Sequence, residues 1–490
     1  MDYKLNNDNF DIVKNSAVAN LFGFVIRLGA RLPFLFVVAF LYGKENFGQY
    51  LFAVTGVETL TVLFLFGFKR SIFQFLDFTS TSSNKENLNN IVVVAILVCL
   101  SLGFVVLTSI YIFYSYFLST VDNSLLFCLL LLLPTSLLYS VSEILLTATR
   151  AVKLVRYEVM TKSIIEPYSL TILSVILFYA GFSEYGLFIA YWCMNIVVLC
   201  CTIYIYLKTI ACASYCLNIR SNPYFFEIGV ILKRSFSVAI DDILMVLMLR
   251  VDVYFLAALT RPEVLGIYGI CLQIITIVKK IKQSFDPILE PVIANSIKIE
   301  NLSNVANELA RVSNLIFWIQ SMIFTFLIFY CDELLLLFAI DDSAASLTLL
   351  LLISSVVISS TFGLSELIFL NKKPTINFYI STIMLLIHVV FCYLLISIFG
   401  ILGAGLAMAI SYSLRSVFQL YLMKRIYKVL PLNRSILVSV GGCILLFVYL
   451  FLINNVLDIS SPFSIVLGII GGLVIYISYG YFAKSLNNQF

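Results

Sequence analysis

The chain has 490 residues, of which 61% are hydrophobic, and its mean hydropathy is +1.03, whereas an ordinary soluble domain has about 45–50% apolar residues. This composition excludes a soluble globular protein and indicates a polytopic membrane protein. The formal net charge of +4 does not indicate nucleic-acid binding, because the basic residues gather in short segments between apolar stretches.

Apolar stretches of about twenty residues, the length needed to cross a bilayer, follow one another along the whole chain. They predict an all-α protein with about fourteen transmembrane helices. The approximate limits are 17–42, 49–68, 91–118, 124–147, 164–181, 185–207, 235–259, 265–285, 312–331, 345–370, 376–398, 402–423, 435–454 and 461–483. No small-residue cleavage site follows the first stretch, so we expect it to remain as an anchor.

The basic residues lie mostly on one side of the predicted topology. With the N-terminus in the cytoplasm, 25 of the 31 Lys and Arg residues fall in inward segments, and two, Lys44 and Arg261, fall in outward loops. This asymmetry follows the positive-inside rule and predicts an even number of spans with both termini in the cytoplasm. The remaining four basic residues lie inside spans: Arg27, Arg31, Arg250 and Arg415.

Three short motifs occur twice, at offsets of 218 to 223 positions. The matched segments are Gly43–Tyr50 with Arg261–Tyr268, Ser142–Glu143 with Ser365–Glu366, and Gly181–Leu187 with Gly400–Leu406. This pattern indicates a duplicated unit of six spans. Because six is even, both units enter the membrane from the same side, as in parallel transporter repeats.

The duplication predicts the domain organisation. We expect an N-terminal six-helix bundle over 1–208, a cytoplasmic linker over 209–234, a second bundle over 235–428 and two additional helices over 429–490. Arg31 falls one position from the counterpart of Arg250, so a central cavity between the repeats would receive an arginine from each.

The same segments resemble those of the oligosaccharide (O-antigen, Wzx-type) lipid flippases of the multidrug/oligosaccharidyl-lipid/polysaccharide (MOP) exporter superfamily. The similar pieces are Gly43–Tyr50, Arg250-Val-Asp252, Thr260–Tyr268, the loop with Arg150 and Lys153, and Ile401–Ala407. The resemblance implies a transporter, not an enzyme, that works by alternating access. Its substrate would be an undecaprenyl-pyrophosphate-linked oligosaccharide, moved from the inner to the outer leaflet of a bacterial cytoplasmic membrane.

The deep arginines are the candidates for binding such a substrate. Arg27, Arg31 and Arg250 each carry a charge that is costly inside a bilayer, and a guanidinium pairs with phosphate oxygens at two points. Structural salt bridges are the alternative. In that case the arginines would be neutralised by nearby carboxylates: Glu58, Asp241, Asp242 and Asp252.

Those four carboxylates are also candidates for coupling transport to a proton or sodium gradient, or for lining the cavity, where they would orient the arginines or contact sugar hydroxyls. Two further carboxylates recur in the repeat, Glu143 and Glu366, each with a basic residue seven positions on, Arg150 and Lys373. We expect these to form gate or structural ion pairs near the inward ends of their helices.

The first span contains a predicted hinge. Pro33 has no N–H, which leaves the carbonyl oxygen of Gly29 without its helical partner and weakens the helix. The chain would bend at Gly29–Pro33 during transport, or the proline would form a static kink. His388, the single histidine, is expected to be packed and hydrogen-bonded. The cysteine pattern predicts neither disulfides nor a metal site, and no cofactor is expected.

Other functions fit the sequence less well. A membrane glycosyltransferase or O-antigen polymerase needs a sizeable outward loop, and every predicted outward loop is short. A multidrug/cation antiporter of the same superfamily has an acidic cavity, whereas deep arginines favour an anionic substrate. A peptidoglycan-precursor (lipid II) flippase shares the predicted fold and span count, so it remains an alternative. The expected partners are the lipid-linked oligosaccharide, membrane lipids and a polysaccharide polymerase.

Overall fold

Helices form every regular element that a computed structural model assigns to the described part of the chain. The described residues are 29, 31–72, 83–118, 124–152, 154–210, 228–298, 302–366, 368–369, 374–428, 435–455 and 461–487. The predicted all-α polytopic fold is confirmed. Within these residues, eleven helices are long and apolar enough to cross a membrane, and a shorter apolar helix covers Ile465–Gly480.

Contacts divide the protein into two compact units, an N-terminal unit that ends at Gly269 and a C-terminal unit that begins at Ile270. The first unit therefore includes the seventh predicted span and the first turns of the eighth. The domain limits expected from the repeat, at 208, 234 and 428, remain a prediction.

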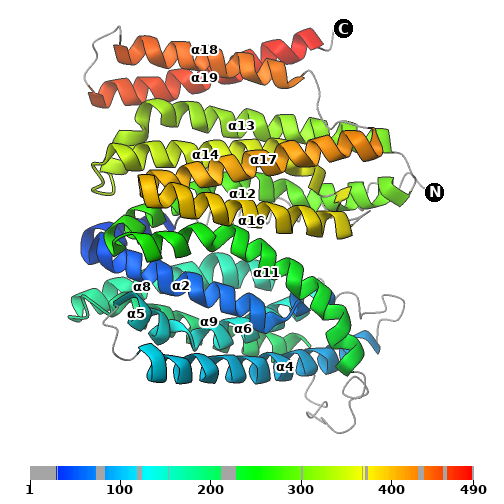
Figure 1. Cartoon of the computed structure of the whole chain (residues 1–490). Coiled ribbons are helices and arrows are strands. Elements are labelled where there is room, and N and C mark those ends of the chain that lie inside the picture. The colour runs from blue at the N-terminus through cyan, green and yellow to red at the C-terminus, as the bar shows by residue number, and fades with distance from the viewer. Residues whose placement is uncertain are drawn as a thin grey trace. The chain divides into compact units, whose positions relative to one another are not determined.

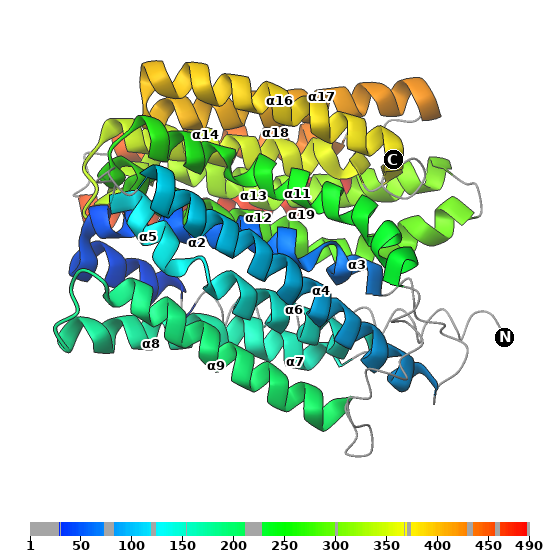
Figure 2. The ribbon, with the colours of Figure 1, turned by 60° about the horizontal axis from the view of Figure 1, so that its bottom comes forward.

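The described part of the N-terminal unit consists of helices that are mostly apolar. Its elements are η1 (Val38–Tyr42), α2 (Gly43–Leu65), α3 (Phe68–Ser71), α4 (Ser83–Phe113), η3 (Tyr114–Leu118), α5 (Ser124–Leu132), α6 (Thr135–Ala151), α7 (Val155–Met160), η4 (Thr161–Ile165), α8 (Glu166–Tyr179), α9 (Gly186–Thr209), α11 (Ile228–Leu259) and the start of α12 (Pro262–Lys298). Helix α2 packs against α5, α6 and α11, and α9 packs against α6 and α8. Figure 2 shows α8 and α9 side by side.

The described part of the C-terminal unit contains the rest of α12 and six further α-helices. They are α13 (Leu302–Leu336), α14 (Ser343–Phe362) with the short η6 (Gly363–Ser365), α16 (Pro374–Phe399), α17 (Ile401–Tyr427), α18 (Ser435–Asn455) and α19 (Ser461–Asn487). Helix α17 packs between α14 and α16 (Figure 1). The α18–α19 hairpin contacts α13 mainly through α18. Trp318 and Tyr476, with ring centroids 4.1 Å apart, join this hairpin to α13.

The first two predicted spans are joined without a loop. Residues 31–42 are helical, and Gly43, at φ +80°, breaks the helix before α2. The ring centroids of Phe34 and Tyr50 are 6.2 Å apart, whereas sixteen residues of unbroken helix would rise about 24 Å. The chain therefore reverses at Gly43, which a positive φ allows glycine to do cheaply.

Each predicted span from the second onwards coincides with one helix or with consecutive helices of the structure. Helix α11, the seventh, is not among the eleven candidate spans, because its 32 residues include six charged ones. The count of fourteen remains a prediction.

The repeat has a structural counterpart at the turns before α9 and α17. Gly181 and Gly400, which are matched in the duplicated motifs, both have a positive φ, of +95° and +58°. Each ends one helix and starts the turn or helix that follows, so the duplicated sequence encodes the same reversal twice.

Candidate functional site

Helices α2 and α11 bring together several of the charged residues that the sequence places inside the membrane. The hydroxyl oxygen of Tyr254 lies 2.7 Å from that of Thr59. The Tyr254 hydroxyl also donates a hydrogen bond to the backbone oxygen of Thr55, at 3.2 Å. These contacts set which turn of α2 faces which turn of α11. Because residues four apart share a helix face, Arg250 lies one turn from Tyr254 on the side that faces α2.

Arg250 forms an ion pair with Glu58 across this contact. The distance between Arg250 Nη2 and Glu58 Oε2 is 2.6 Å, and the two side chains are 29% and 39% exposed. The intraprotein pairing considered from the sequence is therefore present for Arg250. Both side chains are nevertheless partly exposed.

Asp252, the other carboxylate in this part of α11, has different partners. Its side chain is 2% exposed, and it accepts hydrogen bonds from the Tyr268 hydroxyl and, at 2.9 Å, from the backbone N–H of Val253. Two positions along a helix are about 200° apart, so Asp252 and Arg250 point to different sides. Burial and the tyrosine hydrogen bond give Asp252 a structural role in this arrangement.

The duplicated motifs pack against each other around two glycines. A Cβ added to Gly48 would lie 1.8 Å from the backbone oxygen of Pro262, and one added to Gly266 would lie 1.9 Å from that of Lys44. The offset is 218 positions in both cases, so the contact is reciprocal. The same offset relates the neighbouring pair Phe34–Tyr50 to Asp252–Tyr268. This reciprocity is what a two-fold relation between the repeats produces.

A second charge cluster joins α3 to α11 nearer the inward end, meaning the end predicted to face the cytoplasm. Arg70 donates through Nε to Asp242 at 2.8 Å and through Nη2 to Asp241 at 3.0 Å. Gly67 fits beside it, because a Cβ there would lie 2.5 Å from the backbone oxygen of Ser235. The sequence placed Arg70 in an inward segment and gave no sign of this bidentate contact.

Of the two arginines predicted in the first span, Arg27 lies outside the described residues, and Arg31 is half-buried in the helix before η1. Around the predicted hinge, Pro33 is exposed within helical residues 31–37, and a Cβ on Gly29 would lie 3.0 Å from the Tyr168 hydroxyl. Bending at Gly29–Pro33 remains a prediction. The irregular backbone in this part of the structure is the π-helical turn η1, directly before Gly43.

Glu143 is buried in an ion-pair network, but its partner is not the expected one. Its carboxylate lies 2.8 Å from Lys69 Nζ and 2.5 Å from Lys162 Nζ, whereas Arg150 pairs with Glu158 at 3.6 Å. Glu143 is therefore in an ion pair, with Lys69 and Lys162 as its recorded partners, and a gate formed by Glu143 and Arg150 remains a prediction. Seven residues along a helix separate two backbones by about 10 Å, and the neighbouring helices supply nearer cations.

Glu366 pairs with Arg415 at 2.8 Å. Both side chains are mostly buried, at 16% and 13% exposed, so Arg415 is held inside the C-terminal unit and does not extend to the membrane surface. Lys373, the partner expected from the sequence, lies outside the described residues. His388 is buried and lies 3.0 Å from the Ser411 hydroxyl, which confirms that it is packed and hydrogen-bonded.

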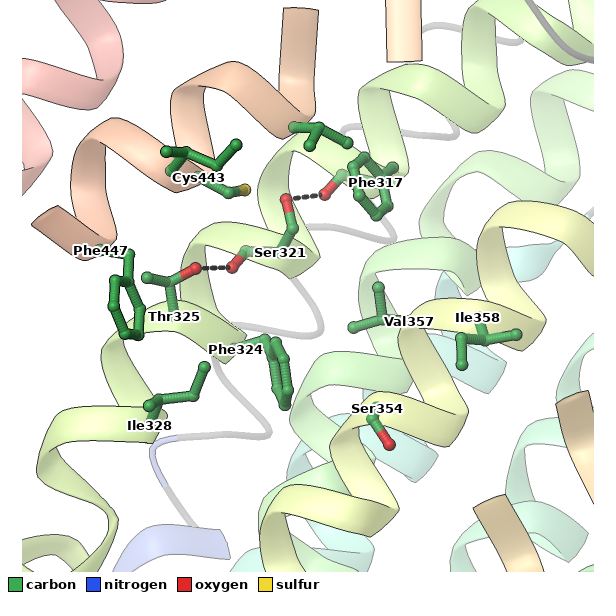
Figure 3. A pocket seen from close by; sticks show the side chains of 12 residues that line it. Phe317, Ser321, Phe324, Thr325, Ile328, Ser354, Val357, Ile358, Cys443 and Phe447 are labelled. Carbon is green, nitrogen blue, oxygen red and sulfur yellow. Dashed lines mark hydrogen bonds between the residues drawn. The ribbon is translucent and has the colours of Figure 1, made fainter. Parts of the chain in front are cut away.

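An apolar groove lies in the C-terminal unit between α13, α14 and α18 (Figure 3). Its volume is about 410 Å³, and Phe317, Phe324, Val357 and Phe447 are among its lining residues. The serine and threonine hydroxyls there are bound to backbone oxygens of their own helices. This groove therefore offers a charged group no partner, and the arginine-bearing face of α11 is the better candidate for a functional site.

Residues 12–296 match the family model described as "Polysaccharide biosynthesis protein". The chain belongs to this family. None of the curated proteins matches the sequence significantly, whereas many solved structures match its fold.

The similar structures are membrane transporters. "Lipid II flippase MurJ, inward closed conformation" has a TM-score of 0.70 at 14% identity and covers 95% of this chain and 99% of its own. A MOP superfamily transporter from Pyrococcus furiosus has a TM-score of 0.61 at 14% identity, covering 85% and 95%. An outward-facing multidrug resistance MATE family transporter has the same values. The chain thus has the fold of the MOP superfamily.

Proposed function

We propose that this protein is a flippase that moves a lipid-linked oligosaccharide, attached through pyrophosphate to undecaprenol, from the cytoplasmic to the outer leaflet of a bacterial inner membrane by alternating access. Membership of the polysaccharide biosynthesis family and the likeness to a lipid II flippase support transport of a lipid-linked saccharide. The anionic pyrophosphate is the part of such a substrate that most needs a counter-charge in hydrocarbon.

The observation that carries the proposal is Arg250, an arginine on a predicted membrane helix whose side chain is 29% exposed and forms an ion pair with Glu58. Arg415, by comparison, is 13% exposed beside Glu366. Arg250 instead presents a charged, fork-shaped donor that suits phosphate oxygens. Arg31, at the neighbouring position in the repeat, and Arg27 are proposed to assist it.

The experiment is complementation of a bacterium that lacks its own surface-polysaccharide flippase. We expect wild-type protein to restore polymer at the cell surface and Arg250→Gln to abolish it at an equal protein level. Arg250→Lys should restore only part, because lysine keeps the charge but loses the two-point geometry. Arg261→Gln, which removes an exposed arginine eleven positions on, is the matched control and should export normally. Normal export by Arg250→Gln would refute the pyrophosphate role.

Transport of lipid II is the second candidate, favoured by the match of the fold to 99% of the lipid II flippase structure. The same variants in a strain depleted of its lipid II flippase decide between the two. Restored growth there, with no surface polymer in the first strain, would favour the peptidoglycan precursor.

Coupling to a proton or sodium gradient is proposed for the carboxylates of α11. Asp241 and Asp242 are held by Arg70, and release of this contact would expose them to a cation. Flipping in sealed vesicles that continues after both gradients are collapsed would contradict the proposal. A polysaccharide polymerase is proposed to receive the flipped product.

A further inference from the structure

The Glu58–Arg250 pair bears on how the substrate anion is released after transport. A flippase must bind its anion tightly enough to take it from one leaflet and must then give it up at the other. A guanidinium–pyrophosphate contact in a low-dielectric site is strong and slow to break unless another anion takes its place. Glu58 lies 2.6 Å from Arg250 and is an anion of that kind, fixed to the protein.

The geometry allows Glu58 to leave and return. Its side chain is 39% exposed, and it lies beside Thr59, whose hydroxyl holds α2 to Tyr254 at 2.7 Å. The contact between the helices therefore does not depend on Glu58. If the carboxylate rotated away from Arg250, Thr59 and Tyr254 would still keep the backbones in register.

The other charged and titratable groups near this position do not replace it. Asp252 is turned away and is bound to Tyr268. Asp241 and Asp242 are bound by Arg70, and at nine and eight positions from Arg250 they lie about 12 Å or more along the helix axis. Tyr254 is engaged with Thr59 and Thr55. Among the described residues, Glu58 is the carboxylate recorded in an ion pair with Arg250.

We propose that Glu58 is the releasing counter-ion of this transporter: it neutralises Arg250 in the empty state, is displaced by the substrate pyrophosphate, and returns to Arg250 to release that pyrophosphate. This inference rests on the proposed function. Glu58 and the substrate pyrophosphate pair with Arg250 in turn. Because Glu58 acts on the substrate only through Arg250, it is a positioning residue. It follows that removal of its charge should make binding tighter and transport slower.

The test uses the purified full-length chain in nanodiscs with farnesyl diphosphate as a short polyprenyl pyrophosphate probe. Glu58→Gln keeps the shape and a hydrogen-bonding group, but removes the competing charge. We expect it to lower the Kd for farnesyl diphosphate by roughly threefold to tenfold, the range for loss of one partly exposed competing ion pair. In the complementation strain, the same variant should export less polymer at an equal protein level. A structural role for Glu58 predicts weaker binding instead.

The controls separate this inference from the proposed function. Glu58→Asp retains the charge and should recover part of the export, and Glu184→Gln, an exposed carboxylate in a turn, should change neither readout. Equal or weaker binding by Glu58→Gln, or normal export despite tighter binding, would overturn the releasing role but leave the pyrophosphate site standing. Failure of farnesyl diphosphate to bind the wild type would overturn both.

Discussion

At the scale of single residues, the membrane-embedded charges differ more in their surroundings than in their partners. Glu58 and Arg250 are 39% and 29% exposed, whereas Glu143 and Lys162 are 7% and 14% exposed. A pair that is open can exchange a partner with a ligand at modest cost. A pair that is enclosed leaves an uncompensated buried charge when one partner is lost. We therefore propose a binding role for the first pair and a stabilising role for the second.

Glu143→Gln tests the stabilising role. The change leaves Lys69 and Lys162 without their shared carboxylate, although Lys162 keeps Glu166 at 3.0 Å. We expect a loss of about 3 kcal/mol in the free energy of unfolding, the lower end of the range for breaking a buried ion pair. The measurement is the thermal unfolding midpoint, Tm, of the purified protein.

The control for that measurement is Glu158→Gln. Its partner Arg150 is 3.6 Å away, and the side chains of Arg150 and Glu158 are 32% and 24% exposed, so the loss should stay within about 1 kcal/mol. Equal Tm changes in the two variants would show that burial does not distinguish these pairs.

At the scale of elements, α11 is fastened to the α2–α3 segment at two charged levels. Arg250 meets Glu58 on α2, and Arg70 on α3 meets Asp241 and Asp242. Between α3 and α11 the packing is also close, since Ser71 and Ser235 are joined by a hydrogen bond of 2.8 Å between their hydroxyl oxygens. For a substrate to enter from the inward end between these elements, the Arg70 contact would have to open.

Arg70→Glu should open that contact, because it places three carboxylates together. A cysteine introduced at Ser235, where the serine is fully buried, would then react faster with a water-soluble maleimide. We expect at least about a tenfold increase in the labelling rate, since removal of a charge-assisted bidentate contact exposes the buried face of α11. The background protein would have its eleven cysteines replaced.

Arg156→Glu is the matched charge reversal at an exposed position, and it should leave labelling of the Ser235→Cys position unchanged. The exchanged pair Arg70→Asp with Asp242→Arg should slow labelling again. If Arg70→Glu labels no faster than the parent, the Arg70 contact does not close this end.

At the scale of the whole molecule, sequence periodicity predicted the helices well, because a span must be apolar for about twenty residues wherever it lies. The duplication was visible because both copies keep glycines where helices touch or reverse, as at Gly48 and Gly266. The partners of Glu143 were not predicted, because Lys69 and Lys162 come from other helices. Sequence spacing indicates only which residues are neighbours on the same helix. For Arg250 the sequence left four possible carboxylates, and the distance to Glu58 decided between them.

Cysteine labelling tests the predicted topology of the whole chain. Lys208→Cys, at the exposed end of α9, and Asp341→Cys, in the exposed turn before α14, should be modified from opposite sides of the membrane. A membrane-impermeant maleimide added to intact cells should label Asp341→Cys and should reach Lys208→Cys only after lysis. Labelling of both positions in intact cells would contradict the predicted orientation.

The reciprocal contact at Gly48 and Gly266 has a consequence for leakage. A carrier of large substrates has to keep protons and ions from following its cargo, and a seal made of long side chains fluctuates. Here the opposing surfaces are backbone atoms. They lie so close that even a methyl group on either glycine would overlap the backbone of the opposite segment. Such a contact leaves no room for a side chain at either glycine. The two backbones would separate along the whole contact at once. This favours a barrier that is either closed or fully open over one that leaks.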